Sequence, residues 1–249
     1  MDDLKFLLGG IFVAIIKNKE KSLNRKNNNS WFVEFIGILM CIAAIPVYAF
    51  FRNIYTSFVI ILVAFAVIIH FSKKRKIYKA GIQGEKEIAK LLDSLNNRYL
   101  VYNDIVIGGK ERGAQIDHLV LSPYGIFCIE TKNMKGVIMG KEEDREWTQI
   151  KGVQGGKNYE KKFYNPCKQS AGHANAVKNI LRHSDFINTP VYSIVTFSSN
   201  KNTNLKVQVH STPVIKSDKL IDFINKKKEI FISDDKLRRI ENIIDKQIC

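Results

Sequence analysis

Asp117, Glu130 and Lys132 lie on the two sides of a short turn, in a pattern that can gather two carboxylates and one ammonium group at a single site. Residues 114–121 and 125–132 alternate as strands do, and the Pro and Gly of the linking segment are turn formers. We therefore predict a β-hairpin that carries the three charged side chains.

The register of this hairpin can be read from its turn. Placing Leu121 opposite Ile126 generates three further cross-strand pairs: Leu119 with Cys128, Asp117 with Glu130, and Gln115 with Lys132. All of these side chains then point to one face of the hairpin, because successive side chains alternate along a strand.

Two opposed carboxylates on one face require a neutralising group. Their Cβ atoms would be roughly 4.5–5.5 Å apart, a separation at which like charges destabilise a strand pair. A hard divalent cation, Mg²⁺ or Mn²⁺, meets the requirement, since such ions bind through one or two carboxylates, water and substrate phosphate. In the alternative interpretation, Asp117 and Glu130 lie at a solvated strand end and Lys132 screens them.

The order Asp, turn, Glu-x-Lys resembles the active-site hairpin of the PD-(D/E)xK nuclease superfamily. Three blocks are more specifically similar to the nuclease-related domain called NERD: GIQGEKEIAKLL at 81–92, QIDHLVLSPYGIFCIETKNMKG at 115–136 and NPCKQSAGHANAVKNIL at 165–181. The resemblance covers most of residues 79–197. It implies a restriction-endonuclease-like α/β core, with a mixed central sheet flanked by helices.

The same resemblance implies metal-dependent hydrolysis of phosphodiester bonds in DNA or RNA. Asp117 and Glu130 would bind Mg²⁺ or Mn²⁺, and Lys132 would position or help to deprotonate the attacking water and stabilise the developing negative charge. Glu85 matches the family's N-terminal helix acid and is a candidate third metal ligand, whereas Gln169 matches a position of the NPxxQ block. The structural alternatives are a favourable first-turn acid for Glu85 and a solvated helix residue for Gln169.

Charge and cysteine content restrict the partners and the compartment. The 249 residues include 39 Lys and Arg against 24 Asp and Glu, a formal net charge of +15, which suits nucleic acid or an anionic membrane surface. The four cysteines show no CxxC motif, and the five histidines form no ligand cluster with them. We therefore expect small buried thiols in a reducing compartment and no zinc site.

Two apolar segments, residues 31–51 and 54–71, are each long enough to cross a bilayer, and Arg52 and Asn53 alone separate them. We predict an antiparallel transmembrane hairpin. Basic residues precede and follow it, so the positive-inside rule places both of its ends, and the C-terminal domain, in the cytoplasm. The alternative is a buried helical hairpin of a soluble protein.

The segment before this hairpin is less regular. Residues 4–16 are apolar but shorter than the ~20 residues that a span needs, so we expect an interfacial or signal-like segment. Residues 17–30 are polar and rich in Asn, which indicates a loop.

The remaining elements must position the hairpin of residues 114–132. After a basic stop at 73–79, apolar spacing predicts a helix over 81–95, and Asn165-Pro166 opens a helix on which Gln169 and His173 share a face. Further strands are expected at 99–107, 137–139, 147–150, 191–197, 206–210 and 214–215, and further helices at 217–225 and 233–248.

We predict four parts: an apolar segment and basic loop at 1–30, a transmembrane hairpin at 31–72, a nuclease-related core at 79–200, and C-terminal strands and helices that pack on the core at 201–249. The chain would be a multi-pass membrane protein with metal-dependent nuclease activity. Two alternatives stay open. One is a membrane-tethered module that binds nucleic acid or protein without cleavage, and the other is a structural protein whose basic surface docks on anionic lipid.

Overall fold

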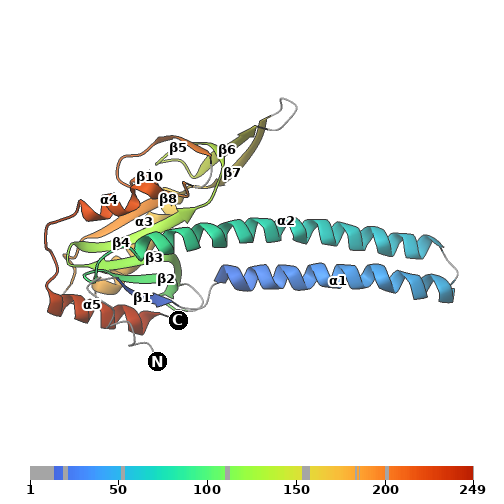
Figure 1. The fold of residues 1–249 in the computed structure, drawn as a ribbon, viewed down its shortest axis with the longest axis horizontal. Coiled ribbons are helices and arrows are strands. Elements are labelled where there is room, and N and C mark those ends of the chain that lie inside the picture. Colours follow the sequence, from blue (N-terminus) through green and yellow to red (C-terminus); the bar gives the residue numbers. More distant parts are fainter. Residues whose placement is uncertain are drawn as a thin grey trace. The chain divides into compact units, whose positions relative to one another are not determined.

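The computed structural model describes residues 14–18, 22–51, 54–109, 113–152, 158–182, 184, 186–199 and 202–248. The chain divides into two compact units. Residues Lys21–Gln83 form one, named here the hairpin unit, and Gly84–Cys249 together with Met1–Glu20 form the other, the core unit. The core unit contains two mixed sheets flanked by helices, which confirms the predicted α/β class (Figure 1).

The larger sheet has six strands in the order β1-β2-β3-β4-β8-β10. The antiparallel strands β2, β3 and β4 are followed by the parallel pairs β4 with β8 and β8 with β10, and β1 pairs with β2 in parallel. Because β4 lies between two partners, its run GIFCI is buried on both faces. The strands are β1 Ile15–Asn18, β2 Leu100–Ile107, β3 Ala114–Ser122, β4 Gly125–Lys132, β8 Val191–Phe197 and β10 Val214–Lys216.

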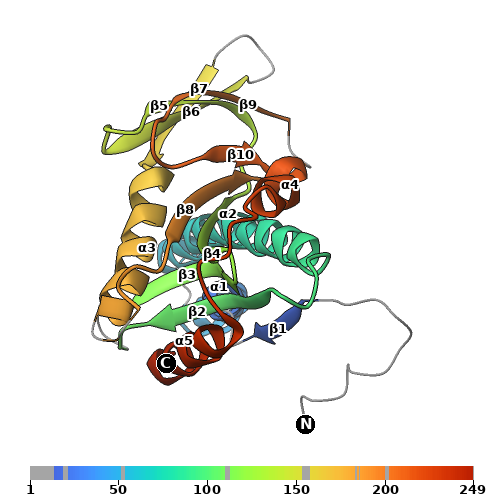
Figure 2. The same ribbon diagram turned by 90° about the vertical axis from the view of Figure 1, so that its left-hand side faces the viewer.

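Helices cover both faces of this sheet (Figure 2). Leu119 and Cys128 belong to a hydrophobic cluster with α3, Pro166–Arg182, and α5, Asp234–Gln247. The alternate residues of the hairpin pack instead with Ile88 and Leu92 of α2 and with α4, Leu220–Asn225, which follows the short 3₁₀ helix η1, Ser217–Lys219. The strand alternation expected from the sequence therefore sets which helix each hairpin residue contacts.

A second sheet of four strands, in the order β7-β6-β5-β9, has one face against the core. Trp147 is fully buried there with Cys167 and Phe197. The sequence predicted three strands of this sheet, at 137–139, 147–150 and 206–210, but not β7, whose side chains are almost all exposed and so lack an alternating apolar pattern. The strands are β5 Gly136–Lys141, β6 Glu146–Gly152, β7 Asn158–Tyr164 and β9 Thr203–Gln208.

The start of the chain differs from the prediction. Residues 15 and 16, expected in an interfacial segment, form the edge strand β1, and Ala14 is 7% exposed. The backbone of β1 pairs with β2, and the Lys17 ammonium group also pairs with Glu241 at 2.8 Å and with Asp245 at 2.6 Å on α5. Residues 4–13 lie outside the described residues.

The hairpin unit consists of α1, Ser22–Phe51, and the first part of α2, Ile54–Leu92. The loop predicted for residues 17–30 is wrong at residues 17 and 18, which belong to β1, and from residue 22 onward, where α1 begins. The helix predicted at 81–95 is the end of α2, since Lys and Arg of the basic run are good helix formers and do not interrupt it. The linking residues 52 and 53 lie outside the described residues.

Both helices are long and apolar enough to span a membrane. Their large apolar side chains are mostly exposed, as for Ile45 at 71% and Phe65 at 60%, which is unlike the core helix of a soluble protein. The acid within α1 is compensated, because the Glu34 carboxylate pairs with Arg75 at 3.1 Å and accepts a hydrogen bond from Ser72.

Candidate active site

The hairpin of β3 and β4 has the predicted register. Leu121 pairs with Ile126 and Leu119 with Cys128, and the ladder continues to His118 and Ile129. Beyond that pair the two strands are no longer paired, so the predicted pairings of Asp117 with Glu130 and of Gln115 with Lys132 are absent from the ladder.

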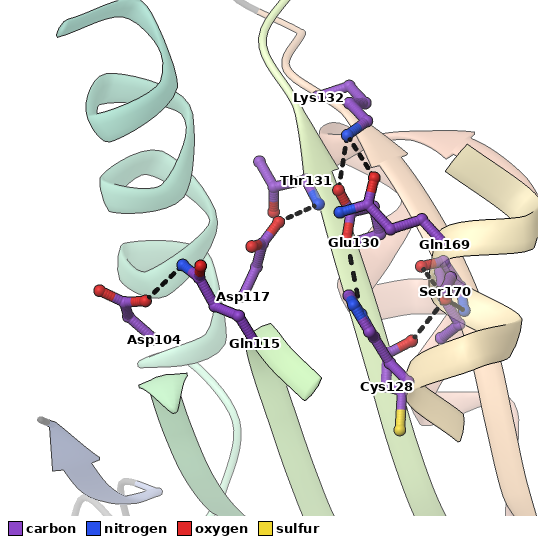
Figure 3. A network of polar contacts seen from close by, with 11 residues as sticks. Asp104, Gln115, Asp117, Cys128, Glu130, Thr131, Lys132, Gln169 and Ser170 are labelled. Atoms are coloured by element: carbon purple, nitrogen blue, oxygen red, sulfur yellow. Dashed lines mark hydrogen bonds and ion pairs between the residues drawn. The ribbon is translucent and has the colours of Figure 1, made fainter. Parts of the chain in front are cut away.

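At the end of the ladder, the Asp117 carboxylate takes the place of a backbone acceptor. Its Oδ2 accepts a hydrogen bond from the backbone N–H of Thr131 at 2.8 Å (Figure 3). The Asp117 side chain therefore reaches toward β4 beside Glu130, and the two carboxylates interact electrostatically.

Glu130, Lys132 and Gln169 form a contiguous polar cluster (Figure 3). The Lys132 ammonium donates to Oε1 of Glu130 at 2.6 Å and to Oε1 of Gln169 at 3.0 Å. Glu130 is only 2% exposed, whereas Lys132 is half-buried at the rim. The structure thus brings together Glu130, Lys132 and Gln169, three of the residues that the sequence singled out. Gln169, for which the alternative was a solvated helix residue, contacts the Lys132 ammonium group.

Two buried polar side chains hold α3, which carries Gln169, against the sheet. Asn165 is fully buried; its side chain accepts from the N–H of Cys167 and donates to three carbonyl groups, those of Lys141, Glu142 and Asp144. One turn later, the Ser170 hydroxyl bonds the carbonyl groups of Cys128 on β4 and Ile194 on β8. Because both anchors flank Gln169, its side chain is placed over the end of β4.

His173 is a site residue that the sequence did not select, although its four-residue spacing from Gln169 indicated a shared helix face. Its Nδ1 lies 3.6 Å from Oε2 of Glu130. Neither atom has a hydrogen-bond partner among the described residues. Burial first, and then the nearby Lys132, lowers the pKa of His173 to about 4, so this histidine is neutral at physiological pH.

Asp104 on β2 is a second residue that the sequence missed. It is 6% exposed, and its Oδ1 accepts a hydrogen bond from the Gln115 side chain at 2.9 Å (Figure 3). Its φ of 49° lies in the left-handed region, which is uncommon for any residue other than glycine. Three carboxylates on adjacent strands, those of Asp104, Asp117 and Glu130, therefore lie close to this end of the sheet.

Burial and repulsion from a neighbouring carboxylate raise the pKa of each of the two central acids. Desolvation raises the pKa of Asp117, and Asp104 adds to the rise, although the Thr131 N–H and Lys132 oppose it. Desolvation followed by the charge of Asp117 raises the pKa of Glu130, against the opposing effect of Lys132. The site therefore lacks enough positive charge to keep both acids ionised with protein groups alone.

A divalent cation fits these residues. Glu130 Oε2 is buried without a hydrogen-bond partner among the described residues, and carboxylate oxygens are the ligands that Mg²⁺ and Mn²⁺ prefer. Within the described ranges, however, no three His, Cys, Asp or Glu side chains are grouped closely enough to hold a metal ion. Asp117 and Glu130 would therefore leave most coordination positions to water and substrate.

The segment of α2 that carries Gly84 and Glu85 lies close to the residue that follows Lys132. Gly84 packs so closely on Asn133, the residue after Lys132, that a Cβ at position 84 would lie 2.6 Å from the Asn133 Cβ. Glu85 follows on the same helix and is half-buried, and its role as a third ligand stays a prediction. Glu87 accepts hydrogen bonds from the hydroxyl groups of Ser198 and Ser217, which ties α2 to the end of β8.

Gly84→Ala is expected to destabilise the core unit by about 1–3 kcal/mol, because the new methyl group overlaps the Asn133 Cβ, which cannot move without its backbone. Thermal unfolding of the full chain in detergent measures this, with the fluorescence of the buried Trp147 as the probe. Gly172→Ala on α3 is the matched control, since a Cβ there meets nothing within 4 Å and improves helix propensity. A melting temperature for Gly84→Ala at or above that of Gly172→Ala would contradict the close packing.

The part of the chain that carries this site matches a known protein family. Residues 80–198 match the family model of the nuclease-related domain, NERD. The chain contains a NERD domain. It is also similar to an uncharacterized protein of Bacillus anthracis, with 29% identity over 204 residues, which are 77% of this chain and 91% of that protein. No solved structure matches the chain.

The NERD domain includes every residue of the cluster just described. It begins in the α2 segment that carries Gly84 and Glu85 and ends at Ser198, which is bonded to Glu87 of that same segment. The resemblance inferred from the three sequence blocks is therefore confirmed. The hairpin unit lies almost wholly outside the NERD match.

Proposed function

We propose that this protein is a membrane-anchored nuclease that hydrolyses phosphodiester bonds of DNA or RNA with Mg²⁺ or Mn²⁺ held by Asp117 and Glu130. The observation that carries the proposal is the convergence of Asp117, Glu130, Lys132 and Gln169 at one end of the NERD-domain hairpin, with a carboxylate oxygen buried and unpartnered there. A protein that only binds has no need of a buried and a half-buried acid that repel each other. The mixed sheet and its hairpin fit a restriction-endonuclease-like core.

Each residue has a distinct task in this reaction. Asp117 and Glu130 bind the ion, with Glu85 as a further candidate ligand. When bound, the ion supplies Lewis-acid polarisation of the phosphate and lowers the pKa of a coordinated water. Lys132 places its ammonium group against the phosphate oxygens and stabilises the charge that develops on them. Gln169 positions Lys132, because it is the second acceptor of the same ammonium group.

Membrane anchoring is supported by the path of the chain. Strand β1, before α1, and the chain from Gly84 onward, which holds all but the first residues of the NERD domain, belong to one compact unit. If α1 and α2 span a bilayer, they must return the chain to the side from which it left, as a hairpin does. Basic residues flank both ends of this hairpin, so we place the core unit in the cytoplasm.

Lys132→Gln is expected to lower cleavage of labelled DNA or RNA by about 10²–10³-fold, the loss typical for one group that stabilises transition-state charge. The assay uses the full chain in detergent with Mg²⁺, Mn²⁺ or EDTA. Lys135→Gln is the matched control: that side chain lies three residues further on and is exposed, so activity should be retained. Nucleic-acid binding by the wild type without metal-dependent cleavage would favour the binding module instead.

A further inference from the structure

A small cleft lies in the hairpin unit, between α1 and α2. Its volume is about 230 Å³, and it is lined by Asn29, Ser30, Val33, Phe71, Lys74 and Tyr78. This volume is several times the ~30 Å³ that one water molecule occupies in the liquid. The cleft therefore has room for a phosphate group and the small headgroup attached to it. Nothing in the proposed nuclease reaction uses it.

The cleft is positively charged. The Lys74 ammonium lies 5.3 Å from the centroid of the Phe71 ring, a cation–π contact that keeps it at the cleft wall. Lys74 belongs to the basic run Lys73-Lys74-Arg75-Lys76, and none of the six described lining residues is acidic. The neighbouring acid Glu34 is neutralised by Arg75 at 3.1 Å. Lys74 is therefore the cationic group that an entering anion would meet.

The cleft lies at one end of the apolar surface formed by α1 and α2 in the hairpin unit. The Ser30 hydroxyl donates to the carbonyl of Phe71 at 3.1 Å, which joins the two helices at this level. The next residue, Trp31, is 53% exposed and stacks on Phe35, and exposed apolar side chains continue from there along α1. Trp and Tyr concentrate where a bilayer meets water, so α1 and α2 in a membrane would hold this cleft at the level of the lipid headgroups.

We propose that this cleft binds the headgroup phosphate of an anionic phospholipid. The proposal rests on the membrane anchoring proposed above. Lys74 pairs with the phosphate charge, and the Asn29 amide and the Tyr78 hydroxyl supply further donors. Basic pockets between membrane helices on the cytoplasmic side recognise anionic headgroups in this way. A bound lipid would hold the hairpin at a defined depth and retain the protein in anionic regions of the membrane.

The test measures lipid retention by native mass spectrometry of the full chain in detergent, titrated with phosphatidylglycerol or phosphatidylcholine. We expect tighter binding of phosphatidylglycerol, and a loss of about fivefold in Lys74→Gln, the change expected for one basic residue at an anionic surface. Lys73→Gln is the matched control, because it removes the same charge from the same run at a residue that does not line the cleft. Both lysines are exposed, so neither change threatens folding.

Equal losses in the two variants would mean diffuse attraction to the basic run and would overturn the site. Displacement of the lipid by millimolar inorganic phosphate would also overturn it, since the cleft would then be a site for free anions. Carbonate extraction of the reconstituted protein from vesicles checks the anchoring separately. A protein released by carbonate refutes both proposals, whereas one that is retained but shows no lipid preference refutes only this one.

Discussion

Asp117→Asn is expected to abolish metal-dependent cleavage, by at least about 10³-fold, while the core unit stays folded and nucleic-acid binding persists. The change removes a ligand of the ion that supplies the Lewis-acid chemistry, so the chemical step is lost. Binding through the basic surface depends on phosphate neutralisation by Lys and Arg, which the substitution leaves intact. The amide oxygen of Asn can still accept the hydrogen bond from the Thr131 N–H, which preserves the end of the hairpin.

The stability of the same variant separates a functional role from a structural one. Desolvation raises the pKa of the Asp117 carboxyl, and its charge raises that of Glu130, so removing the charge relieves repulsion in the metal-free protein. We expect the melting temperature without metal to be unchanged or higher. Asp235→Asn, at an exposed first-turn position of α5, is the control for the substitution itself and should change neither property by much. Undiminished cleavage by Asp117→Asn would show that the β-hairpin of β3 and β4 is not the active site.

The register of the hairpin was predictable because it depends on local chemistry. A Pro and a Gly fix the turn, and period-two alternation then assigns every buried residue to a face, as the pairing of Leu119 with Cys128 confirms. Gln169 was found through a motif, and its contact with Lys132 depends on the anchoring of α3 by Asn165 and Ser170. That anchoring involves residues far apart in the chain, so spacing alone does not reveal it.

Two residues near the site, Asp104 and His173, could not be predicted from the sequence. Asp104 has a left-handed backbone conformation in the middle of a strand, where alternation predicts an extended residue, so strand periodicity could not place its side chain. The packing of α3 on β4 brings His173 close to Glu130. The sequence does not reveal this neighbour, because a histidine on an amphipathic helix has many possible neighbours. The continuous helix α2 was missed for a different reason: its basic run was interpreted as a stop, although no proline interrupts the segment.

Glu130→Gln is expected to remove a pH dependence of stability that the wild type shows between about pH 7 and 9 without metal. Burial and the charge of Asp117 raise the pKa of Glu130 to about 8, above its ordinary value of 4.5. A carboxyl group whose pKa is higher in the folded state binds its proton more tightly there. Its contribution to stability is therefore complete at low pH and is lost as the pH rises through about 8.

Loss of one proton across this window is equivalent to on the order of 1 kcal/mol, or a fall of about 2–4 °C in melting temperature for a unit of this size. The pKa of Asp117, about 6, and that of His173, about 4, lie below the window, so neither group contributes to the fall. Mg²⁺ should restore stability most strongly at the upper pH, because the ion binds the ionised carboxylates. Glu130→Gln should show neither the fall nor the response to Mg²⁺.

Glu142→Gln is the matched control for this measurement, because the sign of the linkage is opposite. Burial is the largest single effect on Glu142 and raises its pKa, but the hydrogen bonds from the Ser211 hydroxyl and from the backbone N–H groups of residues 210–212 together outweigh it and lower the pKa to about 2. Its stabilising contribution is therefore present above about pH 4.5 and is lost only as the pH falls toward 2. The variant should melt at a lower temperature by the same amount at pH 7 and at pH 9. A wild-type melting temperature that rises from pH 7 to pH 9 in EDTA would show that Glu130 is ionised in the folded protein, and the charge deficit inferred for the metal site would be wrong.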